Sequence, residues 1–342
     1  MKIEADTAKG ASEAGELTSR SPRELAWRRF KKNKVGIAAL CTSLFFVSAA
    51  VFAPVVAWLV NVNPNERDTA ALTARGETIG RFGGMSWNHP LGVEPGIGYD
   101  ILARLIYGAR ISFLVAAIAT LASISIGLLI GLLSGYFRGR TDSVLGRFTD
   151  FLLAFPSFFM IIALSAPMIA RIEKSGLARD NSARVIYLIM VLALFGWPYF
   201  SRIMRSQALS LREREFVDAA RVAGASDRRI IFKHILPNAI GIIVVVGTLL
   251  LSGAILAETA LSYLGFGVRP PDVSLGLLIS EYQGSFSISP WLFWWPGTLI
   301  ISIALCINFI GDGLRDAFDP RQRRRITKRD RLQAKLQIKA GE

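Results

Sequence analysis

Long uncharged apolar runs alternate with short charged segments along the 342 residues of this chain. The runs have about 18–27 residues each, and a helix that rises 1.5 Å per residue needs roughly 20 residues to cross a hydrocarbon layer about 30 Å thick. The first run is too long for the apolar core of a cleaved signal peptide and is predicted to be an uncleaved signal anchor. We therefore predict an all-α, polytopic membrane protein with six transmembrane helices at Gly36–Val60, Ile111–Tyr136, Phe148–Ala170, Val185–Arg202, Ala239–Gly265 and Trp291–Gly311.

Basic residues are distributed unevenly between the two sides of the predicted membrane. If the N-terminus lies inside, about three quarters of the 40 lysine and arginine residues fall on internal segments. The external segments are then 61–110, 171–184 and 266–290, of which 171–184 is itself basic and fits the rule poorly. This bias predicts that both termini face the cytosol of a bacterial inner membrane.

The same pattern divides the chain into five parts. We predict a cytoplasmic tail at 1–35, a first transmembrane helix at 36–60, an external loop at 61–110, a membrane core at 111–312 with a cytoplasmic loop at 203–238, and a basic cytoplasmic tail at 313–342. In the first tail, Ser21-Pro22-Arg23-Glu24 predicts the start of a helix. That helix, Glu24–Lys34, sets apolar Trp27 and Phe30 among basic residues, as in helices at an anionic membrane surface. The alternative is a basic stop with no fixed structure.

Composition excludes several classes of function. A net charge of +14 would suggest nucleic acid as a partner of a soluble protein, but 52% hydrophobic residues and a mean hydropathy of +0.40 favour a membrane. Cys41 and Cys306 lie in apolar runs and His89 and His234 in polar segments, so the sequence predicts no disulfide, metal site or haem. It contains no Gly-rich phosphate loop with Lys-Ser/Thr, so we expect no cofactor in this chain.

Three glycines in the second predicted span are spaced four residues apart. Gly127, Gly131 and Gly135 share one helix face, one step beyond Ser123. Small residues at this spacing let a neighbouring helix backbone approach closely in a membrane. We predict a helix-packing face here.

The cytoplasmic loop contains a pattern typical of two short helices. In the first, Phe216, Ala219, Ala220 and Ala223 share one face, and Asp218 lies on the charged face. Gly224 would end this helix in the left-handed conformation. Ser226 or Asp227 would cap a second helix at Arg228–His234, and Pro237 would begin the fifth span. The residues alone leave two interpretations open, a docking surface for another protein or a solvated loop.

This loop resembles the EAA motif of permease subunits of ATP-binding-cassette importers. Asp218-Ala219-Ala220, Gly224 and Leu236-Pro237 match that motif in type and spacing. Asp218 replaces a glutamate, and His234 stands where the motif has isoleucine.

The resemblance narrows to oligopeptide and dipeptide permease subunits and covers roughly residues 21–321. One departure lies outside the membrane, where the family commonly has Gly-Thr-Asp and Gly-Arg-Asp and this chain has Gly92-Val93-Glu94 and Gly98-Tyr99-Asp100. The matching segments are Arg28–Lys34, His89–Gly92, Leu105–Ser112, Glu258 with Leu261–Gly267, Pro270-Pro271, and Gly311–Asp316 through Asp319-Pro320.

The resemblance implies a type I importer permease fold and a peptide as solute. It also implies a second, related permease, two ATPases that bind ATP and Mg, and an external substrate-binding protein. The segment Asp218–Gly224 would then seat in a groove of one ATPase. Glu258, inside the fifth span, would either line the translocation pathway or make a structural hydrogen bond. The alternatives are an importer of nickel or another small solute from the same family, a proton-coupled carrier, and a membrane scaffold without transport.

Overall fold

A computed structural model describes residues 22–318. The predictions for residues 1–21 and 319–342, including the Ser21 cap and the basic C-terminal run, lie outside the described residues. Within that range the regular structure is helical, and β structure is limited to isolated bridges between residues 67 and 100. The main helices are α2 (Pro22–Lys32), α3 (Lys34–Val51), α4 (Ala53–Val60), α5 (Ile101–Phe137), α6 (Gly139–Ala154), α7 (Ser157–Lys174), α8 (Asp180–Arg212), α9 (Glu215–Val222), α10 (Asp227–Arg229), the π-helical η3 (Ile230–Ile235), α11 (Leu236–Tyr263), α12 (Leu275–Tyr282) and α13 (Pro290–Phe318).

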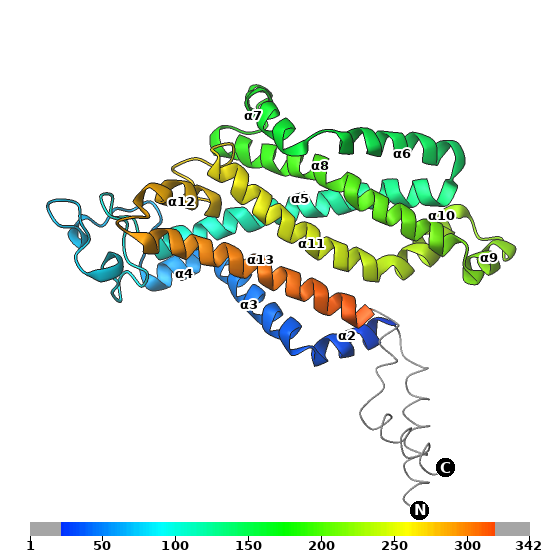
Figure 1. The fold of residues 1–342 in the computed structure, drawn as a ribbon, viewed down its shortest axis with the longest axis horizontal. Helices are drawn as coiled ribbons and strands as arrows, with labels where there is room; N and C mark the ends of the chain where they lie inside the picture. Colours follow the sequence, from blue (N-terminus) through cyan, green and yellow to red (C-terminus); the bar gives the residue numbers. More distant parts are fainter. Residues whose placement is uncertain (1–21, 319–342) are drawn as a thin grey trace, which may run out of the picture.

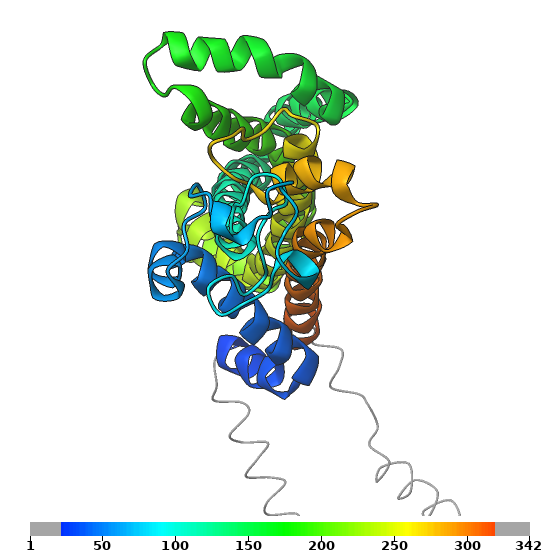
Figure 2. The ribbon, with the colours of Figure 1, turned by 90° about the vertical axis from the view of Figure 1, so that its left-hand side faces the viewer.

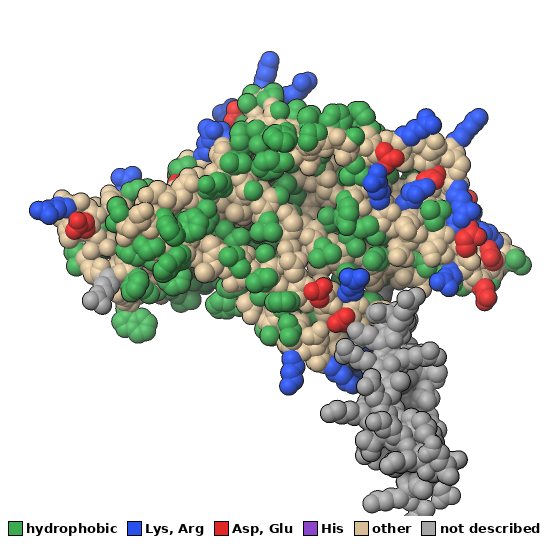
Figure 3. Space-filling view, viewed as in Figure 1, with side chains coloured by type: hydrophobic (Ala, Val, Ile, Leu, Met, Phe, Trp, Pro, Cys, Tyr) green, Lys and Arg blue, Asp and Glu red, His purple; other side chains and the backbone are tan. Residues whose placement is uncertain are grey.

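The long helices α5, α8, α11 and α13 run side by side and give the molecule its long axis (Figure 1). The segment 61–100 and α12 lie at one end, and α9 with α10 lies at the other. Seen from the end that carries 61–100, α2 and α3 lie on one side of the bundle and α6 and α7 on the opposite side (Figure 2). Apolar side chains cover much of the middle of the molecule, and charged side chains gather toward its margins (Figure 3). This distribution suits a protein surrounded by lipid.

The six predicted crossings are accounted for by five long helices and one bent pair. Among the described residues, α3, α5, α8, the helix Asp227–Tyr263 and α13 are each long and apolar enough to span a membrane, and α6 with α7 passes the same test as a pair bent by 82°. An ion pair of 2.6 Å between Arg138 and Glu213 places the ends of α5 and α8 at the same end of the molecule. The chain must therefore return to the opposite end between α5 and α8, and only α6 with α7 lies there.

The predicted third span differs most from the structure. It was expected as one helix at Phe148–Ala170, but Phe155 is extended and Pro156 precedes α7. Proline lacks the N–H that the preceding turn would use and disfavours helical geometry at the residue before it, which separates α6 from α7 at this point.

Other boundaries also differ. The first span is divided at Phe52 into α3 and α4. Helix α5 begins at Ile101 instead of Ile111, because the Asp100 side chain accepts a hydrogen bond of 2.7 Å from the Ala103 backbone N–H and caps the helix there. The segment that precedes α5 therefore ends at residue 100 instead of residue 110. The second short helix expected at Arg228–His234 is not separate but runs without a break into α11.

The three glycines of α5 lie against the backbone of α8. Cβ atoms added at Gly127, Gly131 and Gly135 would lie 2.7, 2.6 and 2.6 Å from the carbonyl oxygens of Trp197, Ser201 and Arg205 respectively. Real Cβ atoms do not approach carbonyl oxygens so closely. Any side chain at these positions would push the two helices apart, so the glycines form the packing face that their spacing predicts.

Candidate functional site

Helix α9 packs back onto the membrane bundle through one edge. Val217 and Ala220, three residues apart, are buried and belong to one apolar cluster with Ile230, Ile231 and Ile235. This contact fixes how α9 is rotated about its own axis, and with it the face that α9 shows to solvent.

The outward face of α9 is not the one expected from the sequence. Ala220 was expected to be offered to a partner together with Phe216, Ala219 and Ala223, but Ala220 is only 8% exposed, whereas the other three are exposed. The burial of Val217 rotates the helix, so that Asp218, Ala219 and Val222 point away from the bundle, and Val222 is 91% exposed. Sequence reasoning gave Val222 no role. In the sequence, the apolar Val222 close to Ala219 and Ala223 is the signal that could have indicated this face.

Gly224 ends α9 in the way its position predicts. Its φ is +76°, in the left-handed region that favours glycine. The backbone N–H of Ala225 donates to the carbonyl of Ala220 at 3.0 Å, and that of Gly224 donates to the carbonyl of Arg221 at 2.9 Å. These two bonds form a Schellman motif, which satisfies carbonyls at the helix end. A Cβ atom at Gly224 would meet nothing within 4 Å, so the space around the turn is open.

Polar contacts tie the surroundings of α9 to the ends of α5 and α8. The Tyr136 hydroxyl, on α5, donates to Asp227 Oδ1 at 2.5 Å. The Arg212 guanidinium, at the end of α8, donates to the Tyr136 carbonyl and lies 5.7 Å from the centre of the Tyr136 ring. Together with the Arg138–Glu213 ion pair, these contacts hold the segments on both sides of α9 to the membrane helices.

Leu236 and Pro237 lie where the π-helical η3 passes into α11. Leu236 is half-buried against the apolar cluster under α9, and Pro237 is exposed. Because Pro237 has no N–H to donate to the preceding turn, the wider π turn before it is a natural accommodation. Asn238 Nδ2 donates to the His234 carbonyl at 2.6 Å and satisfies part of that turn.

Glu258 lies in the protein interior and is fully buried. The Ser262 hydroxyl donates to Glu258 Oε1 at 2.7 Å, and the hydroxyls of Ser112 and Ser274 lie beside the carboxyl group. The Ser112 hydroxyl in turn accepts the backbone N–H of Leu275 at 3.3 Å. The carboxyl group therefore sits where α5, α11 and the start of α12 meet. This placement favours the structural hydrogen bond over the pathway role.

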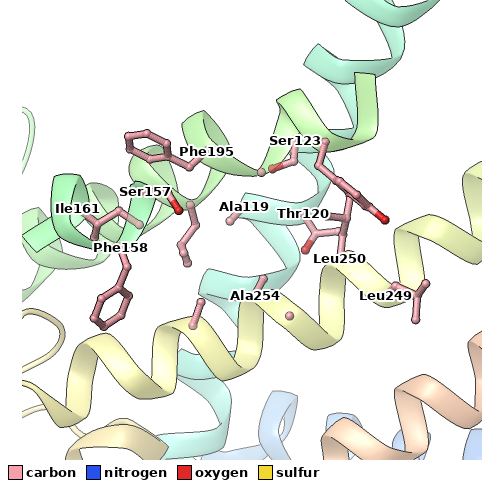
Figure 4. Close-up of a pocket in the computed structure, with 15 residues that line it drawn as sticks. Ala119, Thr120, Ser123, Ser157, Phe158, Ile161, Phe195, Leu249, Leu250 and Ala254 are labelled. Atoms are coloured by element: carbon pink, nitrogen blue, oxygen red, sulfur yellow. The ribbon is translucent and has the colours of Figure 1, made fainter. Parts of the chain in front are cut away.

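A cavity of about 320 Å³ opens instead between α5, α7, α8 and α11 (Figure 4). Alanine and glycine at positions such as Ala119, Gly196 and Gly253 leave this space, and Thr120 and Ser123 contribute hydroxyls. None of the described residues that line it is charged, and Glu258 is not among them. The sequence did not indicate this cavity, because each helix supplies only a few small residues to it.

The segment 61–100 is built around two ionic clusters. His89 Nδ1 lies 2.8 Å from Asp100 Oδ2, and His89 Nε2 lies 3.0 Å from Asp68 Oδ2. Burial disfavours the charged imidazole, but the hydrogen bonds to Asp100 and Asp68 outweigh it and raise the pKa of His89 above its ordinary value.

The second cluster contains Glu94, one of the residues at which this segment departs from the family pattern. Arg104 Nη1 lies 2.7 Å from Glu94 Oε2, and Arg104 Nη2 lies 2.6 Å from Glu281 Oε2. Burial, opposed by Arg104 and reinforced by Glu281, raises the pKa of Glu94. Glu94 thus joins the segment 61–100 to α5 and α12, at a position where the family commonly has aspartate.

Comparisons with known proteins agree with this architecture. Residues 127–324 match the family described as the inner membrane component of binding-protein-dependent transport systems, and residues 21–74 match the N-terminal transmembrane domain of oligopeptide transport permease C. The chain is 40% identical over 304 residues to the oligopeptide transport system permease protein OppC of Mycobacterium tuberculosis, covering 89% of this chain and 96% of that protein. It is 35% identical over 308 residues to the dipeptide transport system permease protein DppC of Alkalihalophilus pseudofirmus, covering 90% and 93%.

A solved structure shows the same fold. A chain of the MetNI methionine ABC transporter, in an inward-facing conformation, superposes with a TM-score of 0.52 at 17% identity, over 63% of this chain and 96% of that one. The helical bundle therefore has the same fold as that transporter chain. From the two family matches and the long alignments with curated relatives, the chain belongs to the inner membrane components of binding-protein-dependent transport systems, within the group of oligopeptide and dipeptide permease C proteins.

Proposed function

We propose that this chain forms half of the translocation pathway of an ATP-driven importer of dipeptides or oligopeptides. It works with a second, related permease, two ATPases that bind ATP and Mg, and an external substrate-binding protein, in a bacterial inner membrane with both termini in the cytosol. The peptide solute is supported by the names of the relatives that cover nine tenths of the chain. The chain itself catalyses no reaction.

The observation that carries this proposal is the way in which α9 is packed on the bundle and exposed to solvent. Asp218, Ala219 and Val222 point outward, Gly224 ends the helix tightly, and the inner edge is packed on the bundle. A short helix held in this way presents a fixed surface to a groove on an ATPase. Leu236 and Pro237 begin α11 directly behind it, so that movement of α9 reaches α8 and α11 together.

The ATPases would drive transport by binding two arrangements of α9 with different affinity. Closure on ATP would displace α9, and the contacts of Tyr136 with Asp227 and Arg212 would transmit this displacement to the inner ends of α5 and α8. Differential binding of two states is what shifts a transporter between inward and outward access. The cavity between α5, α7, α8 and α11 lies among the helices that would move.

The test is Gly224→Val in the reconstituted importer. A β-branched residue at positive φ is strained by about 1–3 kcal/mol, and its side chain would also stand in the open space where an ATPase docks. We expect the six crossings to form and ATPase retention and ATP-dependent uptake of a labelled peptide to fall several-fold.

Gly265→Val is the matched control. Gly265 also has a positive φ, of +83°, with nothing within 4 Å, and it ends α11 at the opposite end of the molecule. Equal ATPase retention and peptide uptake in the two variants would contradict the coupling role of α9. If the same vesicles took up nickel and not peptide, the coupling role of α9 would stand, but the proposed peptide solute would be wrong.

A further inference from the structure

Helix α2 is fixed on the bundle by one of its faces. Ala26 and Phe30 are buried, at 5% and 2% exposed, against the end of α13. Phe30 fills the space over two glycines, since a Cβ atom at Gly313 would lie 2.9 Å, and one at Gly36 3.1 Å, from the Phe30 ring. This contact fixes the rotation of α2.

The opposite face of α2 is basic and carries one large aromatic ring. Trp27, Arg28, Lys31 and Lys32 recur at the spacing of one helix face, and all four are exposed. Lys31 Nζ lies 5.3 Å from the centre of the Trp27 ring, so the aromatic and the cations form one surface. The acidic side chain at its margin is that of Glu24, whose carboxylate lies 3.8 Å from Arg28 Nη2.

This surface must lie beside the membrane. Helix α2 ends at Lys32, and the spanning helix α3 begins at Lys34 with Asn33 as its cap, so nothing separates α2 from the first crossing. A tryptophan among lysines and arginines is the composition of a segment in the headgroup layer, where the ring sits at the interface and the cations meet phosphate. In sequence, the chain also continues from α13 into Arg321 and the run Arg323–Arg325.

We propose that the exposed face of α2, formed by Trp27, Arg28, Lys31 and Lys32, is a binding surface for the headgroups of anionic phospholipids. The occupant is the phosphate of the lipid leaflet next to α2, which is the inner leaflet in the orientation proposed above. Because Phe30 seats α2 on α13, bound lipid also holds the end of α13 in place. A basic stop that only sets topology would need no fixed helix, no buried face and no ring beside the cations.

The experiment measures lipid binding by the complete importer in detergent. Phosphatidylglycerol or phosphatidylcholine is titrated in, and the number of lipids retained and the apparent Kd are read by native mass spectrometry. In the variant with Arg28→Gln, Lys31→Gln and Lys32→Gln, we expect phosphatidylglycerol affinity to fall on the order of 10- to 100-fold, with weak binding of phosphatidylcholine unchanged.

The control removes the same charge from the other end of the molecule. Arg171, Lys174 and Arg179 are exposed near the start of α8, and their replacement by glutamine should leave the affinity for phosphatidylglycerol as it is. Equal affinity in all three proteins, or equal loss in both variants, would overturn the proposal. Since the three α2 side chains are exposed, the variant should fold; if it does not, affinity of the unmodified importer that is insensitive to ionic strength would overturn the proposal equally.

Lipid binding is read here without transport. If the orientation proposed above were wrong, α2 would still bind phosphatidylglycerol, and only the leaflet would change. Failure of this inference is therefore distinct from failure of the proposed function.

Discussion

Asp100 serves two purposes at the start of α5. One carboxylate oxygen accepts the backbone N–H of Ala103 at 2.7 Å, and the other lies 2.8 Å from His89 Nδ1. Asp68 holds the other ring nitrogen, so His89 bridges two carboxylates. A few side chains therefore fix the segment 61–100, which contains little regular structure, to a long membrane helix.

This arrangement makes the stability of the segment 61–100 sensitive to pH. A raised pKa means that the folded state binds a proton to His89 more tightly than the unfolded state does. The stabilisation is fully present below the ordinary histidine pKa of 6.5 and is lost as pH rises through the raised value. The pKa of Asp68 is lowered, chiefly by its hydrogen bond to His89, so its contribution is lost as pH falls below 3.8.

We expect the unmodified protein to exceed His89→Gln in thermal stability by the largest margin between about pH 4 and 6.5, with the margin shrinking at higher pH. Comparing the two proteins at each pH cancels effects they share. If the stability difference between the two proteins grew with rising pH, the folded segment would be stabilised by neutral His89 and not by its charged form.

Glu258 shows what a single residue in a sequence cannot reveal. An acidic residue inside an apolar run indicates either a pathway or a structural role, since both need a paired or hydrated carboxyl group. The choice depends on Ser112 and Ser274, which come from α5 and from the residue before α12. Only the folded chain brings these hydroxyls to the carboxyl group.

At the scale of elements, the contact between α5 and α8 depends on a close approach of the two backbones. Three glycines face three carbonyl oxygens at distances that leave no room for a methyl group. Close approach of two backbones increases dispersion contacts, which stabilise helix pairs in lipid, where burial of apolar surface gives no advantage.

Gly131→Leu should therefore destabilise the protein. The new side chain would begin 2.6 Å from the Ser201 carbonyl oxygen and force α5 away from α8, and overpacking of this kind costs about 1–3 kcal/mol or more. We expect a lower yield of folded complex and a lower Tm in detergent.

The control for that variant is Gly146→Leu. Gly146 is also a helical glycine, on α6, but a Cβ atom there would meet nothing within 4 Å. If the two leucine variants had the same yield and Tm, the tight fit of α5 on α8 would not contribute to stability.

Element boundaries were predictable only where the chain signals them. Most of the spans were identified from hydropathy, because apolar runs of sufficient length leave few alternatives in a membrane. The break between α6 and α7 escaped that reasoning, since the run is apolar on both sides of Pro156 and hydropathy carries no information on direction. The rotation of α9 about its own axis was not predictable either, because this rotation depends on Val217 packing against residues that follow the turn at Gly224.

For the whole molecule, the two ends of the bundle differ in kind. One end carries the ionic clusters of the segment 61–100 and α12, and the other carries α9 and the start of α11. The family resemblance identifies the EAA-like motif from the amino-acid sequence alone, but it does not show which side chains of α9 face outward. It also gives no indication of the cavity, whose lining comes from four helices.

Orientation in the membrane is the remaining property of the whole molecule, and the distribution of charge predicts it. With α9 inside, about three quarters of the 40 basic residues lie on the cytosolic side, and basic residues are retained there during insertion.

Ser226 and Ser287 are both exposed, the first beside α9 and the second before α13. In a chain whose native Cys41 and Cys306 are replaced by serine, a cysteine at position 287 should react with a membrane-impermeant thiol reagent added to intact cells. A cysteine at position 226 should react only after the membrane is opened, because α11 crosses the membrane between α9 and the segment before α13. Labelling of both in intact cells would show that α11, the one spanning helix between the two positions, does not cross the membrane. Labelling of position 226 alone would place α9 outside, either because the whole protein is inverted or because the bent pair α6–α7 does not cross. In both cases the proposed ATPase surface would lie where no ATP is available to drive transport.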